Sequence, residues 1–377
     1  MGVISRVAKW RGPPYRIAQK TAAPAVYDPE EHHACRFRPV LVTGATGRQG
    51  GATARALLAA GVPVRALVRH PATERAKAVE ALGADLVTGD LHDRDSVVRA
   101  AKGVRAVFSV QMPAVAAEGF DFDGEVAQAV NLIEGAQAAG VPQFVHTSTS
   151  GAGRHTEAPG WIAGRWGSLD ASLGAKSTIQ DRVRAAGFSR WTILKPGFFM
   201  ENFLPSMAFL FPRGVEGGLV SVVKPDTRLS LAAVDDIGRA AAAAIAEPER
   251  FHGVELELAS DYLSMTEIAE VLSRALGTHL SAPDMTEEQA LAAGMPAMGA
   301  SHEWMNTAGQ PPARSTPGTS AFPSPASRNG LGSTCGPRLD TQGAAGRDGH
   351  PGSGPHLCPG HRLADPSPFS GKMTRYA

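Results

Sequence analysis

Cysteine is scarce in this chain of 377 residues. The three cysteines, Cys35, Cys335 and Cys358, all lie outside the segment that we expect to fold around a core. A framework of disulfide bonds is therefore not expected, and a reducing cytoplasm is the compartment that best fits this cysteine usage.

Long apolar runs and an excess of one charge are also missing. The longest strongly apolar run, Ala240 to Ala246, is far shorter than the roughly 18 to 20 residues needed to cross a bilayer. Lysine and arginine number 37 against 36 aspartates and glutamates, so no overall field draws the chain to nucleic acid or to an anionic membrane. We expect small-molecule partners, with no direct contact to nucleic acid or membrane.

The two ends of the chain lack the composition of a folded domain. Residues 1–37 are expected to form a flexible arm; the first 27 residues are basic and without acid, as in a transit peptide, but Pro13 and Pro14 would break an amphipathic helix. In residues 307–377, 23 of 71 residues are proline or glycine, and valine, isoleucine and glutamate are absent. We predict a disordered tail there. His356, Cys358 and His361 are close together in it, but no fourth ligand is evident and no metal site is predicted.

Between these ends, short β-branched runs alternate with segments of helical length from Arg38 onward. Strict alternation predicts an α/β fold with a doubly wound parallel sheet, the Rossmann arrangement, over residues 38–197. The predicted strands are Val40–Thr43, Val62–Val68, Asp85–Thr88, Ala106–Val110, Phe144–Thr147 and Trp191–Leu194, and the predicted helices are Gln49–Ala60, Ala72–Leu82, Asp93–Ala101, Gly124–Ala139 and Ala171–Ala186.

The alternation loosens after Pro196. Residues 198–306 are expected to complete the fold as a small α+β cap over the carboxyl edge of the sheet, where such caps hold substrate. Within this segment we predict helices at Val234–Ala246 and Met265–Leu276 and a strand at Val254–Ala259.

A glycine-rich turn follows the first predicted strand and leads into a helix. Gly44 would permit the tight turn, Gly47 would let the backbone approach a pyrophosphate, and Gly50 would allow helix and strand to pack closely. A purely structural turn is the alternative, but its place between strand and helix favours a dinucleotide site. The cofactor-binding residues predicted here are Gly44, Ala45, Thr46, Gly47, Arg48, Gln49 and Gly50.

Arg69 ends the second strand, 19 residues beyond Gly50. An NAD-binding fold normally places an acid there for the ribose 2′-hydroxyl, and no acid occurs between Gly50 and Glu74. Arg69 and Arg48 could instead pair with a 2′-phosphate, which favours NADP(H) as the cofactor. A solvated arginine at a strand end is the plainer alternative.

Most short-chain reductases have a tyrosine four residues before a lysine, and this chain has no such pair among its four tyrosines. Ser172 stands at the tyrosine spacing from Lys176, and a serine hydroxyl is too weak an acid to replace a phenol. Lys176 could hold the nicotinamide ribose or act as the acid itself. His146 is expected to be a core histidine, and His155 is a possible proton donor.

These motifs together resemble the NmrA-like family of atypical short-chain dehydrogenases/reductases over about residues 38 to 309. The resemblance implies that Gly44 to Gln49 wrap the pyrophosphate, that Arg69 meets the 2′-phosphate and that Lys176 reaches the nicotinamide ribose. It also implies an adenine contact at Asp90 and Leu91, a ribose contact at Ser109, Val110 and Gln111, and a nicotinamide contact at Phe199, Met200, Glu201 and Asn202. The matching segments are Val42–Gly51, Ala66–Arg69, Gly89–Leu91, Lys176 and Pro196–Phe203.

The sequence leaves two functions open. The first is an NADPH-dependent reductase of a small planar acceptor such as a quinone, which accepts hydride with little acid catalysis and so suits a site without tyrosine. The second is a non-catalytic NADP(H) sensor that regulates a protein partner, because a fold of this kind does not settle activity.

Overall fold

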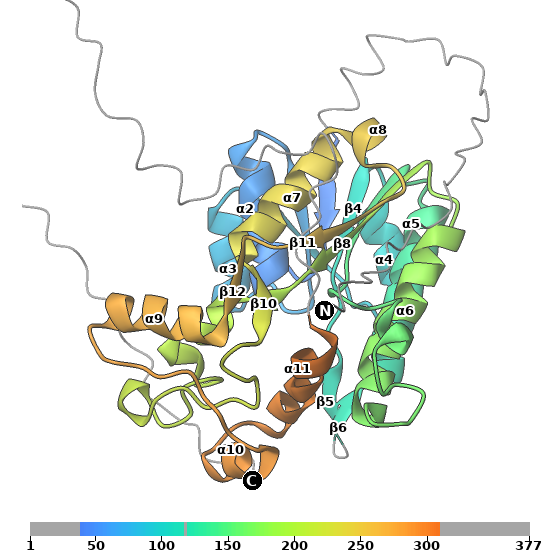
Figure 1. The fold of residues 1–377 in the computed structure, drawn as a ribbon. Coiled ribbons are helices and arrows are strands. Elements are labelled where there is room, and N and C mark those ends of the chain that lie inside the picture. The colour runs from blue at the N-terminus through green and yellow to red at the C-terminus, as the bar shows by residue number, and fades with distance from the viewer. Residues whose placement is uncertain (1–37, 117–118, 310–377) are drawn as a thin grey trace, which may run out of the picture. The chain divides into compact units, whose positions relative to one another are not determined.

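The computed structural model describes residues 38–116 and 119–309 (Figure 1). The predictions of a flexible arm and of a disordered tail beyond Gly309 concern residues outside this range, as do the three cysteines, His356 and His361. Helix α11 (Met305–Ala308) includes Thr307 and Ala308, so the folded part ends slightly later than the change in composition indicates.

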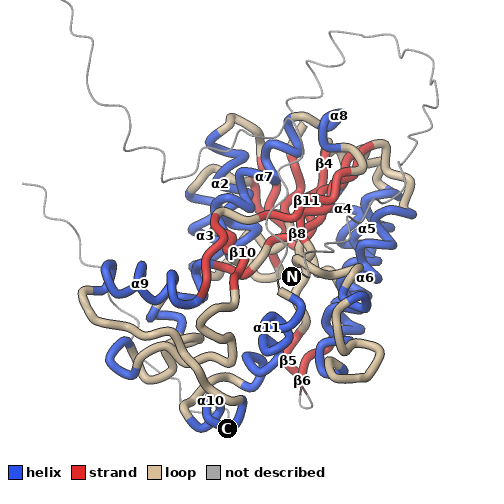
Figure 2. Tube along the Cα trace, in the orientation of Figure 1, coloured by secondary structure: helices blue, strands red, loops and turns tan. Residues whose placement is uncertain are grey.

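Seven parallel strands form the central sheet, and strands are coloured red in Figure 2. Their order is β3-β2-β1-β4-β7-β8-β11, and every neighbouring pair is parallel. The order reverses between β1 and β4, and ligands of open α/β sheets bind outside the carboxyl ends of strands at such a point. The strands are β1 (Val40–Val42), β2 (Val64–Val68), β3 (Asp85–Thr88), β4 (Ala106–Ser109), β7 (Gln143–Thr147), β8 (Arg190–Pro196) and β11 (Val254–Leu258).

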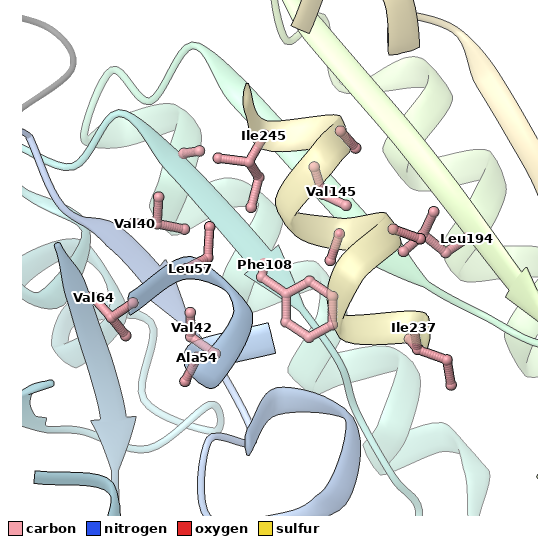
Figure 3. Close-up of a cluster of buried hydrophobic side chains, with 14 of the residues drawn as sticks. Val40, Val42, Ala54, Leu57, Val64, Phe108, Val145, Leu194, Ile237 and Ile245 are labelled. Atoms are coloured by element: carbon pink, nitrogen blue, oxygen red, sulfur yellow. The ribbon is translucent and has the colours of Figure 1, made fainter. Parts of the chain in front are cut away.

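The sheet is buried on both faces because apolar side chains alternate along its strands. In β1, Val40 and Val42 join one core layer and Leu41 joins the other. The first layer packs against α2 (Arg48–Ala59), α3 (Glu74–Ala81) and α7 (Val234–Ala246), and Figure 3 shows side chains from β1, β4, α2 and α7 meeting there. The second layer packs against α4 (Arg94–Ala101), α5 (Phe122–Ala138) and α6 (Gly167–Ala185). This arrangement confirms the predicted doubly wound Rossmann fold.

Two elements of residues 198–306 belong to the main sheet and its helical layer. Helix α7 packs directly on α2, since a Cβ on Gly238 would lie 2.5 Å from the Ala52 carbonyl carbon, and β11 extends the main sheet beside β8. The rest of residues 198–306 surrounds a second sheet. In that sheet β10 pairs antiparallel with β12 and parallel with β9. Its elements are β9 (Phe198–Phe199), β10 (Arg228–Ala232), β12 (Asp261–Ser264), α9 (Met265–Leu276), α10 (Glu287–Ala292), the 3-10 helix η5 (Ala297–Trp304) and α11; α8 (Pro248–Phe251) lies between α7 and β11.

A short hairpin between β4 and α5 was not predicted. Strands β5 (Ala114–Ala116) and β6 (Gly119–Asp121) have only three residues each, too few for alternation to be recognised. Within the described residues, no helix combines the length and apolar character required to span a bilayer.

Candidate functional site

The glycine turn after β1 leaves no room for side chains at two of its positions. Gly44 has a φ of +61°, and a Cβ there would lie 2.7 Å from Val110 Cγ1. A Cβ on Gly50 would lie 2.3 Å from the Gly44 carbonyl oxygen. The turn therefore packs closely against the Val110 side chain, which follows β4, and against the backbone of the first turn of α2.

The amino terminus of α2 differs from those of the next three helices. Thr73, Asp93 and Asp121 cap α3, α4 and α5 with side-chain oxygens. Gly47 gives α2 no side-chain cap, and no acid lies in its first turn. The first N–H groups of a helix lack partners within it, and the helix dipole favours an anion at this end. This terminus can accept a phosphate oxygen.

A hollow of about 350 Å³ lies beside the carboxyl ends of β2 and β3. We call it the β2–β3 hollow. Arg69 is exposed in it and has no salt bridge to another described residue, whereas Arg99 from α4 stands 3.7 Å from Asp93. Arg69 is therefore the group in the hollow that is suited to meet an anion. Its lining is Arg69, His70, Thr88, Gly89, Asp90, Asp93, Ser96 and Arg99.

Local hydrogen bonds fix the backbone of Asp90 and Leu91. Asp90 N donates to Ser96 Oγ at 3.0 Å, and its Oδ1 accepts from His92 N at 2.9 Å. The Leu91 carbonyl accepts from Asn131 Nδ2 at 2.9 Å. Asp90 lines the same hollow as Arg69, as an adenosine-binding role would require.

A group of polar side chains, which we call the buried polar cluster, lies at the carboxyl ends of β4 and β7. Its members are Ser109, Gln111, Glu125, His146 and Lys176. Gln111 Nε2 donates to Ser109 Oγ at 3.0 Å, and Ser109 Oγ lies 3.1 Å from His146 Nδ1. Burial, and secondly the positive charge of Lys176, lower the pKa of His146 to about 3. His146 is therefore neutral near pH 7, and its buried Nε2 has no partner among the described residues.

Lys176 enters this cluster from α6. Its Nζ lies 2.5 Å from Glu125 Oε1 and 3.4 Å from the Gln111 carbonyl oxygen. The Glu125 side chain is 0% exposed and that of Lys176 is 16% exposed. The lysine that the sequence singled out is thus paired with a buried acid that sequence reasoning missed.

The predicted nicotinamide contacts lie on β9 and the 3-10 helix η2 (Met200–Phe203). Phe199 is half-buried, and Met200 packs against the apolar cluster of the cap. Glu201 is instead engaged with α7, because its Oε1 accepts from Val234 N at 3.0 Å and so caps that helix. Asn202 is half-buried beside it.

Two further contacts connect the glycine turn to its surroundings. Arg48 Nη2 donates to the sulfur of Met207, in the 3-10 helix η3 (Pro205–Met207), and Gln49 Oε1 accepts from Thr147 Oγ1 at 2.7 Å. The turn therefore touches both the cap and the end of β7. Within the turn, Ala45 is buried and Thr46 is exposed.

His155 does not reach the buried polar cluster through any hydrogen bond in the described chain. Its Nδ1 accepts from Gly153 N at 3.2 Å, its ring packs edge-on against Trp161, and burial lowers its pKa.

Two residues of the site, Glu125 and Arg99, were not predicted from the sequence, and they differ in whether the sequence held a signal for them. Glu125 shares the buried stripe of α5 with Ala129 and Leu132, and an acid on an apolar stripe is a detectable signal. Arg99 left none, because its position depends on how α4 packs.

Comparison with known proteins identifies relatives of this chain in sequence and in fold. An NAD(P)H azoreductase of Xenophilus azovorans is 32% identical over 252 residues, which cover 67% of this chain and 78% of the azoreductase. An NADPH-dependent quinone oxidoreductase from Escherichia coli, solved with NADPH, superposes with a TM-score of 0.58 at 25% identity, over 72% of this chain and 89% of that one.

A third protein has a different description. NmrA, a negative transcriptional regulator solved with NAD, has a TM-score of 0.52 at 21% identity, over 66% of this chain and 74% of that one. A likeness at this identity concerns the fold alone. Residues 38–311 match the NmrA-like family as a whole, which confirms the resemblance seen in the sequence: the chain belongs to the NmrA-like family.

Proposed function

We propose that this protein is an NADPH-dependent reductase of a small planar acceptor such as a quinone. The observation that carries the proposal is that the glycine turn, which leads into the uncapped α2 terminus, and Lys176 both contact the segment after β4, at the point where the strand order reverses. Gly44 packs against Val110, and Lys176 Nζ lies 3.4 Å from the Gln111 carbonyl oxygen. The named activities of the azoreductase and of the quinone oxidoreductase support a reductase.

The cofactor is inferred from the residues along the carboxyl edge of the sheet. The turn from Gly44 to Gly50 and the α2 terminus would hold the pyrophosphate, and Arg69 in the β2–β3 hollow would meet the 2′-phosphate. Arg99 lines the same hollow but lies 3.7 Å from Asp93, so Arg69 is the cation in it that would meet the phosphate. These groups favour NADP(H) over NAD(H).

The acceptor class is inferred from what surrounds Lys176. Tyr262 is the one tyrosine among the described residues, and it lies on β12 beneath the Arg228 guanidinium, 5.4 Å from the ring centroid. No described phenol is therefore paired with Lys176. Bound NADPH would supply a hydride, and water would supply the proton that completes reduction of a quinone to its hydroquinone. An acceptor that needs little acid catalysis suits these residues.

The first experiment is calorimetric titration of the purified full chain with NADPH, NADP and NADH in parallel, followed by NADPH oxidation with a panel of quinones and azo dyes. Tight NADPH binding, weak NADH binding and turnover of one acceptor class are expected. Failure of all three dinucleotides to bind would refute the proposal.

Tight binding without any turnover would favour the second candidate, an NADP(H) sensor with a protein partner. The contact of Arg48 with Met207 is the observation behind it, because a ligand that engages Arg48 would compete with a cap residue. Limited proteolysis with and without NADP would then show whether the cap responds to the cofactor.

A further inference from the structure

Glu125 lies on a helix face that otherwise carries apolar residues. Ala129, Leu132 and Ala136 continue the same buried stripe of α5 toward the core. An ionised carboxylate is costly to bury unless it is paired. Lys176 provides the pairing at 2.5 Å, from helix α6, which lies beside α5 (Figure 1).

The donors of the Lys176 ammonium can be counted. A lysine ammonium has three N–H donors. Glu125 Oε1 takes one, and the Gln111 carbonyl oxygen, 3.4 Å away, takes a second. One donor is then left for a ligand at the carboxyl end of β4, where Val110 and Gln111 follow the strand.

The remaining members of the buried polar cluster carry no charge near pH 7. His146, on β7, is neutral because burial and Lys176 lower its pKa to about 3. Ser109 and Gln111 are uncharged hydrogen-bonding groups that contact each other. Within this cluster Glu125 therefore faces a single cation, and its Oε2 is buried without a partner among the described residues.

We propose that Glu125 is a positioning residue for Lys176, and that it holds the ammonium so that one N–H is presented to the nicotinamide ribose. The inference rests on the proposed binding of NADP(H) and adds a second helix, α5, to that site. Glu125 touches neither cofactor nor acceptor. Its effect on the ligand passes through Lys176 alone.

The test is a double-mutant cycle on the dissociation constant for NADPH, measured by calorimetry on the full chain. Glu125→Gln keeps the shape of the side chain and removes its charge, and we expect about tenfold weaker NADPH binding. In the Lys176→Met background the same change should have no further effect on binding. Circular dichroism of each variant shows whether it folds.

Glu134→Gln is the matched control, because Glu134 lies on the same helix in an exposed pair with Arg94 at 3.2 Å. Its NADPH affinity should equal that of the wild type. If the wild type binds no NADPH, the proposed function fails and this inference falls with it. If the wild type binds and Glu125→Gln binds equally well, or if Glu125→Gln costs the same in both backgrounds, the inference alone is overturned.

Discussion

The β2–β3 hollow and the buried polar cluster are two parts of one candidate cofactor site, and they are built in opposite ways. In the hollow, Arg69 is exposed and Arg99 stands 3.7 Å from its acid. In the cluster, Glu125 is fully buried and Lys176 lies 2.5 Å from it. Exposed charges contribute little to folding, whereas breaking a buried pair is costly. Substitutions in the hollow should therefore change ligand binding alone, and substitutions in the cluster should change folding as well.

Lys176→Met should have the largest effect. It leaves Glu125 as a buried carboxylate without its cation, which should lower the free energy of unfolding by about 3 to 5 kcal/mol. Urea denaturation measures the change. The double variant Lys176→Met/Glu125→Gln should recover much of the loss, and a single variant as stable as the wild type would erase the contrast between the two regions.

Gly50→Ala should come next. The added Cβ would lie 2.3 Å from the Gly44 carbonyl oxygen, so α2 must move away from the turn. We expect a loss of about 1 to 3 kcal/mol of stability and no measurable NADPH binding in calorimetry.

Gly174→Ala is the control for that change, because Gly174 lies within α6 and a Cβ there would have no neighbour within 4 Å. It should raise stability by about 0.5 to 1 kcal/mol, as alanine does in a helix. A loss of stability in both variants would mean that steric closeness at the turn is not the cause.

Arg69→Ala should weaken NADPH binding by about tenfold, or about 1.4 kcal/mol, and leave the unfolding free energy unchanged. NADH binding should be unaffected, since NADH has no 2′-phosphate. Titration calorimetry with both cofactors makes the comparison. Arg274→Ala, an exposed arginine on α9, is the control, and an equal loss for NADPH and NADH would contradict the assignment of Arg69.

Near pH 7 His146→Asn should produce the smallest effect, because the contribution of His146 to the pH dependence of stability is confined to acid. Burial lowers its folded-state pKa from 6.5 to about 3, so between these pH values the unfolded chain binds a proton that the folded chain does not. Stability should therefore fall as the pH drops through this window, by at most about 1.4 kcal/mol per pH unit from this group. His146→Asn should flatten the curve of unfolding free energy against pH, and His70→Asn, in the exposed hollow, is the comparison.

The sheet was largely predictable because its signals are local. Runs such as Val40 to Val42 are apolar on both faces and bounded by turns, which identifies buried parallel strands. Helix α7 and strand β11 were predicted at nearly the observed bounds, but the sequence did not show which layer each of them joins. The polar stretch between β8 and α7 interrupts the alternation, so only the pairing of β11 with β8 shows that the main sheet continues.

The candidate site divides in the same way. The glycine turn and Arg69 could be predicted from the sequence, because each stands at the end of a predicted strand. The lack of a tyrosine paired with Lys176 could be predicted from residue spacing alone. The roles assigned to them stay predictions until binding is measured. The partners of Lys176 could not be read, because Gln111 and Glu125 come from other elements, 65 and 51 residues away. Pair interactions of this kind depend on helix packing rather than on local sequence.

The contact between α2 and α7 limits which sequences this fold can accept. At Gly238 the backbone φ is ordinary for any residue, but a Cβ would lie 2.5 Å from the carbonyl carbon and oxygen of Ala52 and 2.9 Å from Thr53 N. The obstacle is backbone rather than a side chain that could change rotamer. If α7 is varied at random and folded variants are selected, glycine should therefore be recovered at position 238. The half-buried Ala242 and Ala243 should instead tolerate other small residues.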